Sequence, residues 1–287
     1  MPVETYVNGR YVSHAEAVVH IEDRGYQFAD AVYEVIAVTG GEIIDEVLHM
    51  QRLFRSLREL NMAVPMGARS MGLVLREILR RNRVREGALY LQVSRGVAPR
   101  NHAWPSEIKP TMVVSTRAMK WPKSFADVMP ITIITVADER WSRPDIKTVG
   151  LLPNSLARMQ ADAAGAEDTW MVDKNDQITE GSSANAWIVT EGGELVTRQL
   201  SHAILAGVTR QAIMAFANNA GLVIAERAFS VVEAKAAREA FQTSTTALVK
   251  PVVKIDGATI SGGKPGHVTE RVFEAYLTHF QSFGEGL

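Results

Sequence analysis

A polar run that contains proline, residues 116–124, most constrains the fold of this chain, because it separates two series of strand-like and helix-like segments. In the first series, Asn8-Gly9 supplies the positive φ angles of a tight hairpin turn within 5–12. Apolar residues at helical spacing, among them Met50, Leu53 and Leu57, predict an amphipathic helix. The remaining pattern predicts strands at 32–38, 41–44, 88–94 and 112–115, and helices at 49–62 and 70–81.

The second series begins near Pro130 and mixes the same two kinds of segment. Its β-branched and aromatic runs predict strands at 131–136, 146–152, 168–173, 185–190 and 247–255. Its helices are expected at 154–164 with Asn154 as N-cap, at 207–219 before Gly221, from Ser230, where Ser230 and Glu233 have capping-box spacing, and at 267–280.

This order of segments predicts an α+β protein with two lobes of unequal size. We expect a small N-terminal α/β domain at 1–118, an interdomain linker at 119–124 and a larger domain at 125–287. A chain of 287 residues is long enough for two modest domains, and its 46% hydrophobic content is ordinary for a protein with a real core.

Composition limits the classes of partner. A net charge of −1 provides no long-range field for nucleic acid or an anionic membrane. The chain has no cysteine, and its seven histidines lack metal-ligand spacing, so we expect no thiolate chemistry and no catalytic metal. No run approaches the ~20 apolar residues of a membrane span, and no leader of signal-peptide type is present. We therefore expect a soluble, cytoplasmic protein.

Lys147 lies in the segment Asp145-Ile146-Lys147-Thr148-Val149, which has the apolar character of a buried strand end. A buried lysine has a lowered pKa and can form a Schiff base with an aldehyde. A snorkelling surface lysine is the ordinary alternative. Lys250, in Ala247-Leu248-Val249-Lys250-Pro251, has a similar context, and periodicity alone does not choose between the two lysines.

Glu180 begins the sequence Glu180-Gly181-Ser182-Ser183-Ala184-Asn185. A buried carboxylate can keep a pyridine nitrogen protonated, and small residues let the backbone approach a ligand closely. The ordinary alternative is a turn residue after the hairpin around Lys174-Asn175-Asp176. A serine nucleophile at Ser182 or Ser183 is disfavoured, because the Gly-x-Ser-x-Gly elbow is absent.

Two segments offer a place for a phosphate. Gly207-Val208-Thr209-Arg210 opens a helix, where free N–H groups and the helix dipole favour an anion. The run 243–246 adds hydroxyls and backbone donors, although an edge strand is the alternative there. Arg52 could supply a full positive charge, although an exposed helix arginine is the commoner case.

Arg100 and His102 follow a strand through a turn at Gly96 and Pro99. Residues spaced i, i+2 in extended chain point the same way, and arginine can hold a carboxylate through two parallel hydrogen bonds. The alternative is an exposed loop. Tyr33 on its own would be assigned as a half-buried strand tyrosine.

Together, these motifs and their order resemble the fold-type IV pyridoxal phosphate transaminases, most closely the bacterial D-amino acid transaminases. The resemblance runs from Tyr6-Val7-Asn8-Gly9 to Gly263-Lys264-Pro265-Gly266. It implies a two-lobed enzyme whose larger, C-terminal lobe is β-barrel-like, and a homodimer.

The resemblance also implies the role of each residue. It assigns cofactor attachment to Lys147 and the pyridine-nitrogen partner to Glu180. The remaining cofactor contacts that it implies are Arg52, Ser183, Leu205, Val208, Thr209, Ser244 and Thr245. It assigns the substrate carboxylate to Tyr33, Arg100 and His102.

The activity implied is transfer of an amino group from a D-amino acid such as D-alanine to a 2-oxo acid such as 2-oxoglutarate, with ping-pong kinetics. Branched-chain L-amino acid transaminases, (R)-amine transaminases and aminodeoxychorismate lyases share the cofactor motifs and remain alternatives. A serine hydrolase or a non-catalytic binding protein is disfavoured by the full motif set.

Overall fold

The computed structural model describes residues 3–219 and 221–284, which form two compact units. The first unit is Met1–Trp121 with Ile146–Gly150 and Phe280–Leu287, and the second is Pro122–Asp145 with Leu151–His279. The predicted linker, 119–124, spans the residue where the chain first changes unit. The predicted boundaries give each domain one continuous range, whereas 146–150 belongs to the compact unit of the N-terminal residues.

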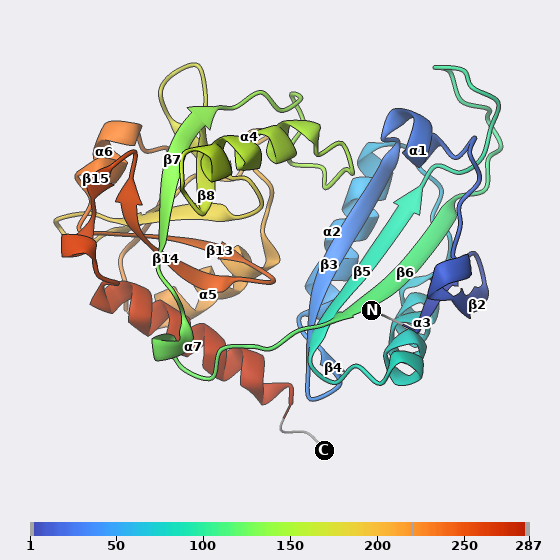
Figure 1. Ribbon diagram of the computed structural model, residues 1–287, viewed down its shortest axis with the longest axis horizontal. Coiled ribbons are helices and arrows are strands. Elements are labelled where there is room, and N and C mark those ends of the chain that lie inside the picture. The colour runs from blue at the N-terminus through green and yellow to red at the C-terminus, as the bar shows by residue number, and fades with distance from the viewer. Residues whose placement is uncertain (1–2, 220, 285–287) are drawn as a thin grey trace. The chain divides into compact units, whose positions relative to one another are not determined.

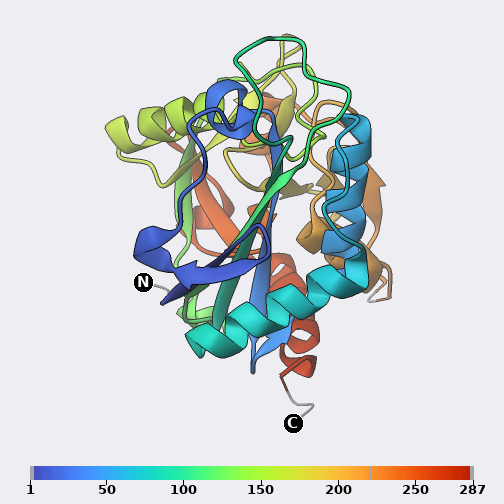
Figure 2. The ribbon, with the colours of Figure 1, turned by 90° about the vertical axis from the view of Figure 1, so that its right-hand side faces the viewer.

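The first unit is a six-stranded sheet with its two long helices, α2 and α3, on one face (Figures 1 and 2). The strands occur in the spatial order β2-β1-β6-β5-β3-β4. They are β1 (Glu4–Val7), β2 (Arg10–Ser13), β3 (Ala31–Thr39), β4 (Glu42–Ile43), β5 (Gly87–Ser94) and β6 (Thr111–Ala118). Its helices are α1 (Arg24–Phe28), α2 (Glu46–Glu59) and α3 (Ala68–Asn82).

The core of this unit lies between its sheet and the two long helices. Helix α2 packs on β3, and α3 packs on β1 and β6. Met50, Leu53 and Leu57 of α2 are buried at helical spacing, as predicted. They pack with strand residues such as Ile36 and Leu89 in one apolar cluster. Every strand and long helix predicted before residue 116 is confirmed, including the hairpin at Asn8-Gly9.

The second unit is a curled, mostly antiparallel sheet. Its path is β12-β11-β10-β13-β14-β7-β8-β9, with β15 paired to β14. Strand β9, at one end of the path, also lies against β10, so the sheet is barrel-like as expected. The strands are β7 (Ile131–Ala137), β8 (Asp168–Val172), β9 (Ile178–Gly181), β10 (Asn185–Val189), β11 (Leu195–Thr197), β12 (Ile224–Glu226), β13 (Glu239–Ser244), β14 (Leu248–Ile255) and β15 (Ala258–Thr259).

The helices of the second series are α4 (Leu152–Ala163), α5 (Val208–Asn219), α6 (Val231–Lys235) and α7 (His267–Ser282). Trp170, Phe229 and Ile188 lie in one apolar cluster of the second unit. Helix α4 covers β7 and β8 through Ala157. Among the residues described, no helix is long and apolar enough to cross a membrane.

Three local predictions are wrong. Residues 146–152 do not form a strand, and only one bridge, Val32 to Thr148, pairs this segment with β3. Helix α4 begins at Leu152, because proline is tolerated in the first turn, so Asn154 is not its N-cap. The run 243–246 is not an edge strand, since β13 lies between β10 and β14. By contrast, the Ser230 side chain does accept from Glu233 N at the start of α6.

Candidate active site

Lys147 lies beside strand β3 in the first unit. Its carbonyl accepts a hydrogen bond from Tyr33 N at 3.0 Å, and Val149 N donates to Ala31 O at 3.1 Å. The pairing with β3 goes no further, because the chain turns at this point and Thr148 N donates to Ile146 O at 2.8 Å. The Lys147 Nζ lies 4.4 Å from the centroid of the Tyr33 ring. The sequence-predicted attachment lysine and one predicted carboxylate contact are therefore neighbours.

Tyr33 in turn lies beside a second tyrosine that the sequence analysis missed. The rings of Tyr33 and Tyr90 are 5.7 Å apart between centroids. Tyr90 Oη donates to Gln92 Oε1 at 2.7 Å. Burial, reinforced by Tyr33, raises the pKa of Tyr90 to about 12. Tyr90 is therefore protonated and uncharged at neutral pH.

Lys250, the other candidate lysine, lies in the second unit on β14, opposite Gln242 of β13. The pKa of Glu167 is lowered mainly because the amide and hydroxyl of Thr132 donate to its carboxylate. The charge of Lys250 adds to this lowering. Lys250 thus has a carboxylate in its electrostatic surroundings, and the Lys147 ammonium lies over the Tyr33 ring.

Arg100 and His102 lie in the irregular loop between β5 and β6 and are both exposed. They meet at Phe28 of α1, which sequence reasoning missed. The Arg100 Cζ lies 5.0 Å from the Phe28 ring centroid, and the His102 ring lies 5.6 Å from it. The structure therefore brings this predicted pair together around an aromatic side chain, rather than along extended chain.

Arg52 is buried, so the exposed-helix alternative is wrong. Its Nε and Nη2 donate to Glu34 at 2.8 and 2.6 Å, and His49 Nδ1 lies 2.8 Å from the same carboxylate. Burial acts to raise the pKa of Glu34, but Arg52 and His49 outweigh it and lower that pKa to about 2. Glu34 is therefore ionised at neutral pH, and its paired hydrogen bonds fix the plane of the Arg52 guanidinium.

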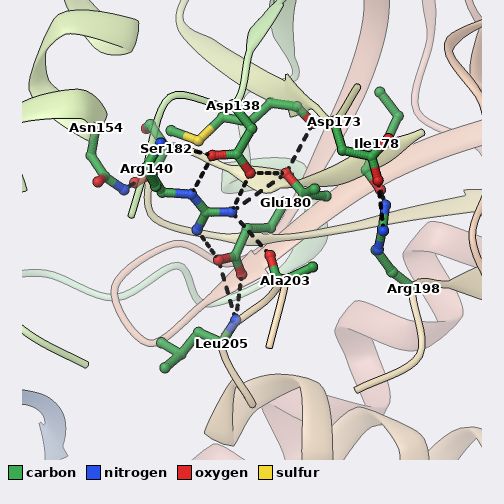
Figure 3. Close-up of polar contacts among 12 residues, drawn as sticks. Asp138, Arg140, Asn154, Asp173, Ile178, Glu180, Ser182, Arg198, Ala203 and Leu205 are labelled. Carbon is green, nitrogen blue, oxygen red and sulfur yellow. Dashed lines mark hydrogen bonds and ion pairs between the residues drawn. The ribbon is translucent and has the colours of Figure 1, made fainter. Parts of the chain in front are cut away.

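Glu180 is the centre of a polar network in the second unit (Figure 3). One carboxylate oxygen accepts from Arg140 Nη1, the other accepts from Asn185 Nδ2 at 3.0 Å, and Leu205 N lies within 3.2 Å of both. Burial raises the pKa of Glu180, while the Arg140 guanidinium opposes that rise. The carboxylate is thus buried and oriented from several sides, as an acceptor for a ring N–H requires.

Arg140 connects this carboxylate to Asp138, and sequence reasoning missed both residues. The Nε and Nη2 of Arg140 bind Asp138 at 2.9 and 2.7 Å, and Nη2 also donates to Ala203 O at 3.1 Å. Burial acts to lower the pKa of Arg140, but the two carboxylates raise it. The only signal in the sequence was a charged triplet, Asp138-Glu139-Arg140, directly after the apolar run of β7.

The two serines after Glu180 behave differently. Ser182 Oγ donates to Asp168 Oδ1 at 2.5 Å, and its carbonyl accepts from Asn154 Nδ2 at 2.8 Å. Asp168 also accepts from Gln242 at 2.7 Å. A hydroxyl bound to a carboxylate in this way supports the turn rather than a Ser–His nucleophile. Ser183 is exposed at the tip of the same turn.

The predicted phosphate contacts other than Arg52 lie at two turns of the second unit. Val208 and Thr209 are buried in the first turn of α5, and Thr209 Oγ1 lies 3.4 Å from Tyr276 Oη. The first N–H groups of a helix have no partner within it, and the dipole favours an anion there. Ser244 and Thr245 lie where β13 turns into β14, and Ser244 Oγ accepts from Ala247 N at 3.2 Å.

Helix α5 is held close to the Glu180 network. Asn185 Nδ2 donates to Leu205 O at 3.0 Å as well as to Glu180. A side-chain carbon at Gly207 would lie 2.0 Å from Asn185 Oδ1, so only glycine fits there. A buried carboxylate, a helix start and hydroxyl-rich turns within one unit are a donor set that fits a phosphorylated pyridine. The described residues contain no group of three potential metal ligands.

Comparison with known proteins identifies the family. Residues 31–255 match the family described as amino-transferase class IV. The D-alanine aminotransferase of Staphylococcus haemolyticus is 35% identical over 97% of this chain and 98% of its own. That of Bacillus licheniformis is 36% identical over 92% and 93%. The branched-chain amino acid aminotransferase from Thermobaculum terrenum, solved in its PLP-form, superposes with a TM-score of 0.86, at 21% identity, over 99% and 94%.

The family match and the two D-alanine aminotransferase relatives identify the chain as an aminotransferase. This chain belongs to the class IV aminotransferases, and the fold expected from the sequence is confirmed.

Proposed function

We propose that this protein is a pyridoxal 5′-phosphate-dependent transaminase that moves an amino group from D-amino acids such as D-alanine to 2-oxo acids such as 2-oxoglutarate. The observation that carries the proposal is the position of the Lys147 ammonium over the ring of Tyr33, in the unit that also holds Arg100 and His102. The relatives from S. haemolyticus and B. licheniformis, both named D-alanine aminotransferases, support the choice of a D-amino acid.

In this proposal, the cofactor contacts are those that the resemblance implies. Lys147 would attach to the aldehyde of the cofactor, and Glu180 would accept a hydrogen bond from its ring nitrogen. Arg52, Val208, Thr209, Ser244 and Thr245 hold the phosphate, with Ser183 beside them, and Leu205 packs on the ring. When bound, pyridoxal 5′-phosphate supplies an electron-withdrawing ring that stabilises negative charge at the substrate Cα.

The chain's own residues then orient the substrate and move its proton. Arg100, His102 and Tyr33 bind the carboxylate, where the arginine fork gives two parallel hydrogen bonds. The free ε-amino group of Lys147 would take the Cα proton as a general base and, as a general acid, deliver it to the cofactor carbon that carried the aldehyde. Because one base reaches one face of the substrate, the side on which the carboxylate is held decides the handedness of the amino acid.

The first test compares donors on the purified, cofactor-loaded protein. D-alanine with 2-oxoglutarate is expected to react with ping-pong kinetics and to shift the cofactor absorbance, because its carboxylate fits the proposed contacts. L-leucine and an aromatic (R)-amine are the comparison donors. Faster turnover of either one would contradict the D-amino acid assignment and favour a branched-chain or amine transaminase.

The lysine is assigned separately by borohydride reduction and peptide mapping. The label is expected on Lys147, and Lys147→Ala is expected to lose turnover by at least roughly 10³-fold, because the same group attaches the cofactor and moves the proton. Lys250→Ala is the matched control and should keep its activity. A label on Lys250 would contradict the assignment.

A further inference from the structure

The loop that carries Arg100 and His102 runs from the end of β5 to the start of β6 with no regular secondary structure beyond a single bridge. An exposed loop of this length has many conformations, and ordering it costs entropy. Its side chains can bind a carboxylate with a fixed orientation only if its backbone is held. In the structure, the side chains of Arg24, Arg95 and Asp30 hold the backbone of this loop.

Arg24 binds the backbone of the loop at Asn101 and His102. Its Nη1 donates to Asn101 O at 2.6 Å and its Nη2 donates to His102 O at 3.2 Å. Only 4% of the Arg24 side chain is exposed, and its Cζ lies 4.6 Å from the centroid of the Phe28 ring. The opposite edge of the guanidinium is fixed, since Nε donates to Asp30 Oδ2 at 2.8 Å.

A second arginine, Arg95, binds the same aspartate. Arg95 Nε donates to the same Asp30 oxygen at 2.7 Å, and its other nitrogens donate to Asn61 O at 3.1 Å and Leu60 O at 2.9 Å. Its Cζ lies 3.8 Å from the centroid of the Trp104 ring, further along the loop. Asp30 thus aligns two buried guanidinium groups. That of Arg24 binds the loop backbone, and that of Arg95 lies over the Trp104 ring.

The base of the loop is also tied to the segment that carries Arg24. Arg24 N donates to Gly96 O at 2.9 Å, and Arg95 N donates to Asp30 O at 3.0 Å. Gly96 has φ +116°, and a side-chain carbon there would lie 1.9 Å from Lys109 O. Both ends of the loop are therefore fixed close together, and Arg24 acts on its middle.

We propose that Arg24, aligned by Asp30, is a positioning residue for substrate recognition, because it fixes the backbone from which Arg100 and His102 bind the substrate carboxylate. This inference rests on the proposed function, which assigns the carboxylate to that pair. A lysine at position 24 would keep the charge but lose the planar fork that spans two carbonyls and Asp30.

The test uses the cofactor-loaded holoenzyme with Arg24→Met and, in case that variant folds poorly, Arg24→Lys. Three quantities are measured: KM and kcat for D-alanine, the Kd of propionate, which offers a carboxylate without an amino group, and the amide hydrogen exchange of residues 97–110. We expect KM and the propionate Kd to rise roughly 10- to 100-fold, as misplacement of a binding group does. We expect kcat to change less, and exchange to speed up in the loop.

Arg76→Met is the matched control. Arg76 lies in the same unit, pairs with Glu46 through two nitrogens at 2.5 and 3.0 Å, and donates to a carbonyl, Gly72 O, at 3.2 Å. Its removal should leave KM and the propionate Kd unchanged. If the Arg24 variants keep wild-type KM and Kd, or lose only kcat and thermal stability, the positioning role is wrong. A wild-type protein that does not turn over D-alanine would instead overturn the proposed function.

Discussion

At the scale of single residues, the Glu180 carboxylate in the second unit is held by three partners. It accepts from Arg140, Asn185 Nδ2 and Leu205 N. Burial alone would favour the neutral acid, and the cationic partner favours the charged form. Since Arg140 is also held by Asp138, its guanidinium cannot turn away from Glu180 without breaking that second pair. A bound pyridine would therefore meet a carboxylate of fixed orientation.

Replacing Glu180 by glutamine tests this residue. The amide keeps the shape but carries no negative charge for a ring N–H, so kcat is expected to fall roughly 10²- to 10³-fold, as on loss of one oriented electrostatic group. Cofactor Kd, measured by fluorescence quenching, is expected to change much less, because the phosphate contacts remain.

Glu167→Gln serves as the control for Glu180→Gln. It removes a carboxylate of the same unit that binds Thr132. Full activity in Glu180→Gln, or an equal loss in the control, would remove Glu180 from the mechanism.

The sequence predicts residues of this kind unevenly. Glu180 and Arg100 lie in recognisable local patterns, so both could be named in advance. Arg140 and Glu34 could not, because their roles come from partners far along the chain: Arg140 binds a residue 40 positions away, and Glu34 binds one 18 positions away. A charged residue looks the same in sequence whether it faces water or a buried partner.

At the scale of elements, hydrophobic periodicity was sufficient for the long helices α2 and α3 and insufficient where pairing is non-local. The segment 146–150 has strand-like composition, yet it forms one bridge with β3 and then turns. Strand β13 was missed because Glu239-Ala240 has little strand propensity, and it is stabilised by β10 and β14 on its two sides. Pairing partners of this kind are not encoded locally.

The start of α5 gives an element-scale prediction. In Gly207→Ala, the added carbon would lie 2.0 Å from Asn185 Oδ1 and 3.3 Å from the Arg210 side chain, so Asn185 or the helix must move. Overpacking of this kind costs roughly 1–3 kcal/mol. Asn185 binds both Glu180 and Leu205 O, so the shift should also weaken cofactor binding.

The Gly207 prediction is checked by thermal unfolding and by titration with pyridoxal 5′-phosphate. Gly192→Ala, in the same unit, is the control, because its nearest neighbour would be Thr190 Oγ1 at 3.8 Å. The packing argument fails if Gly207→Ala matches wild type in both stability and cofactor affinity.

At the scale of the whole molecule, two buried carboxylates, Glu34 in the first unit and Glu180 in the second, respond to acid in opposite directions. The pKa of Glu34 in the first unit falls from 4.5 to about 2, so the folded state binds its proton less readily than the unfolded chain. Its contribution to stability is complete above about pH 4.5 and is lost as the pH falls through about 2. The pKa of Glu180 in the second unit is raised, so its contribution grows on acidification.

The first unit also contains a histidine that acts in the same direction as Glu34. Burial lowers the pKa of His49 below 6.5, although Glu34 opposes that change. The unfolding free energy therefore falls as the pH drops below about 6.5, because His49 is protonated in the unfolded chain before it is protonated in the folded state. On acidification from pH 7, the first unit should lose stability first.

Glu34→Gln tests this order of unfolding. The change from 4.5 to about 2 corresponds to roughly 3 kcal/mol, so the variant should lose about that much unfolding free energy at pH 7 and little near pH 2.5. Hydrogen exchange of β3 and α2 peptides reports the first unit, and β10 and β13 peptides report the second. Glu77→Gln, whose partners Arg80 and Arg81 lie on the surface of α3, should change exchange far less, because solvent screens that pair. A Glu34→Gln deficit that stays constant from pH 7 to pH 2.5 would show that the loss comes from packing rather than from the ionised carboxylate.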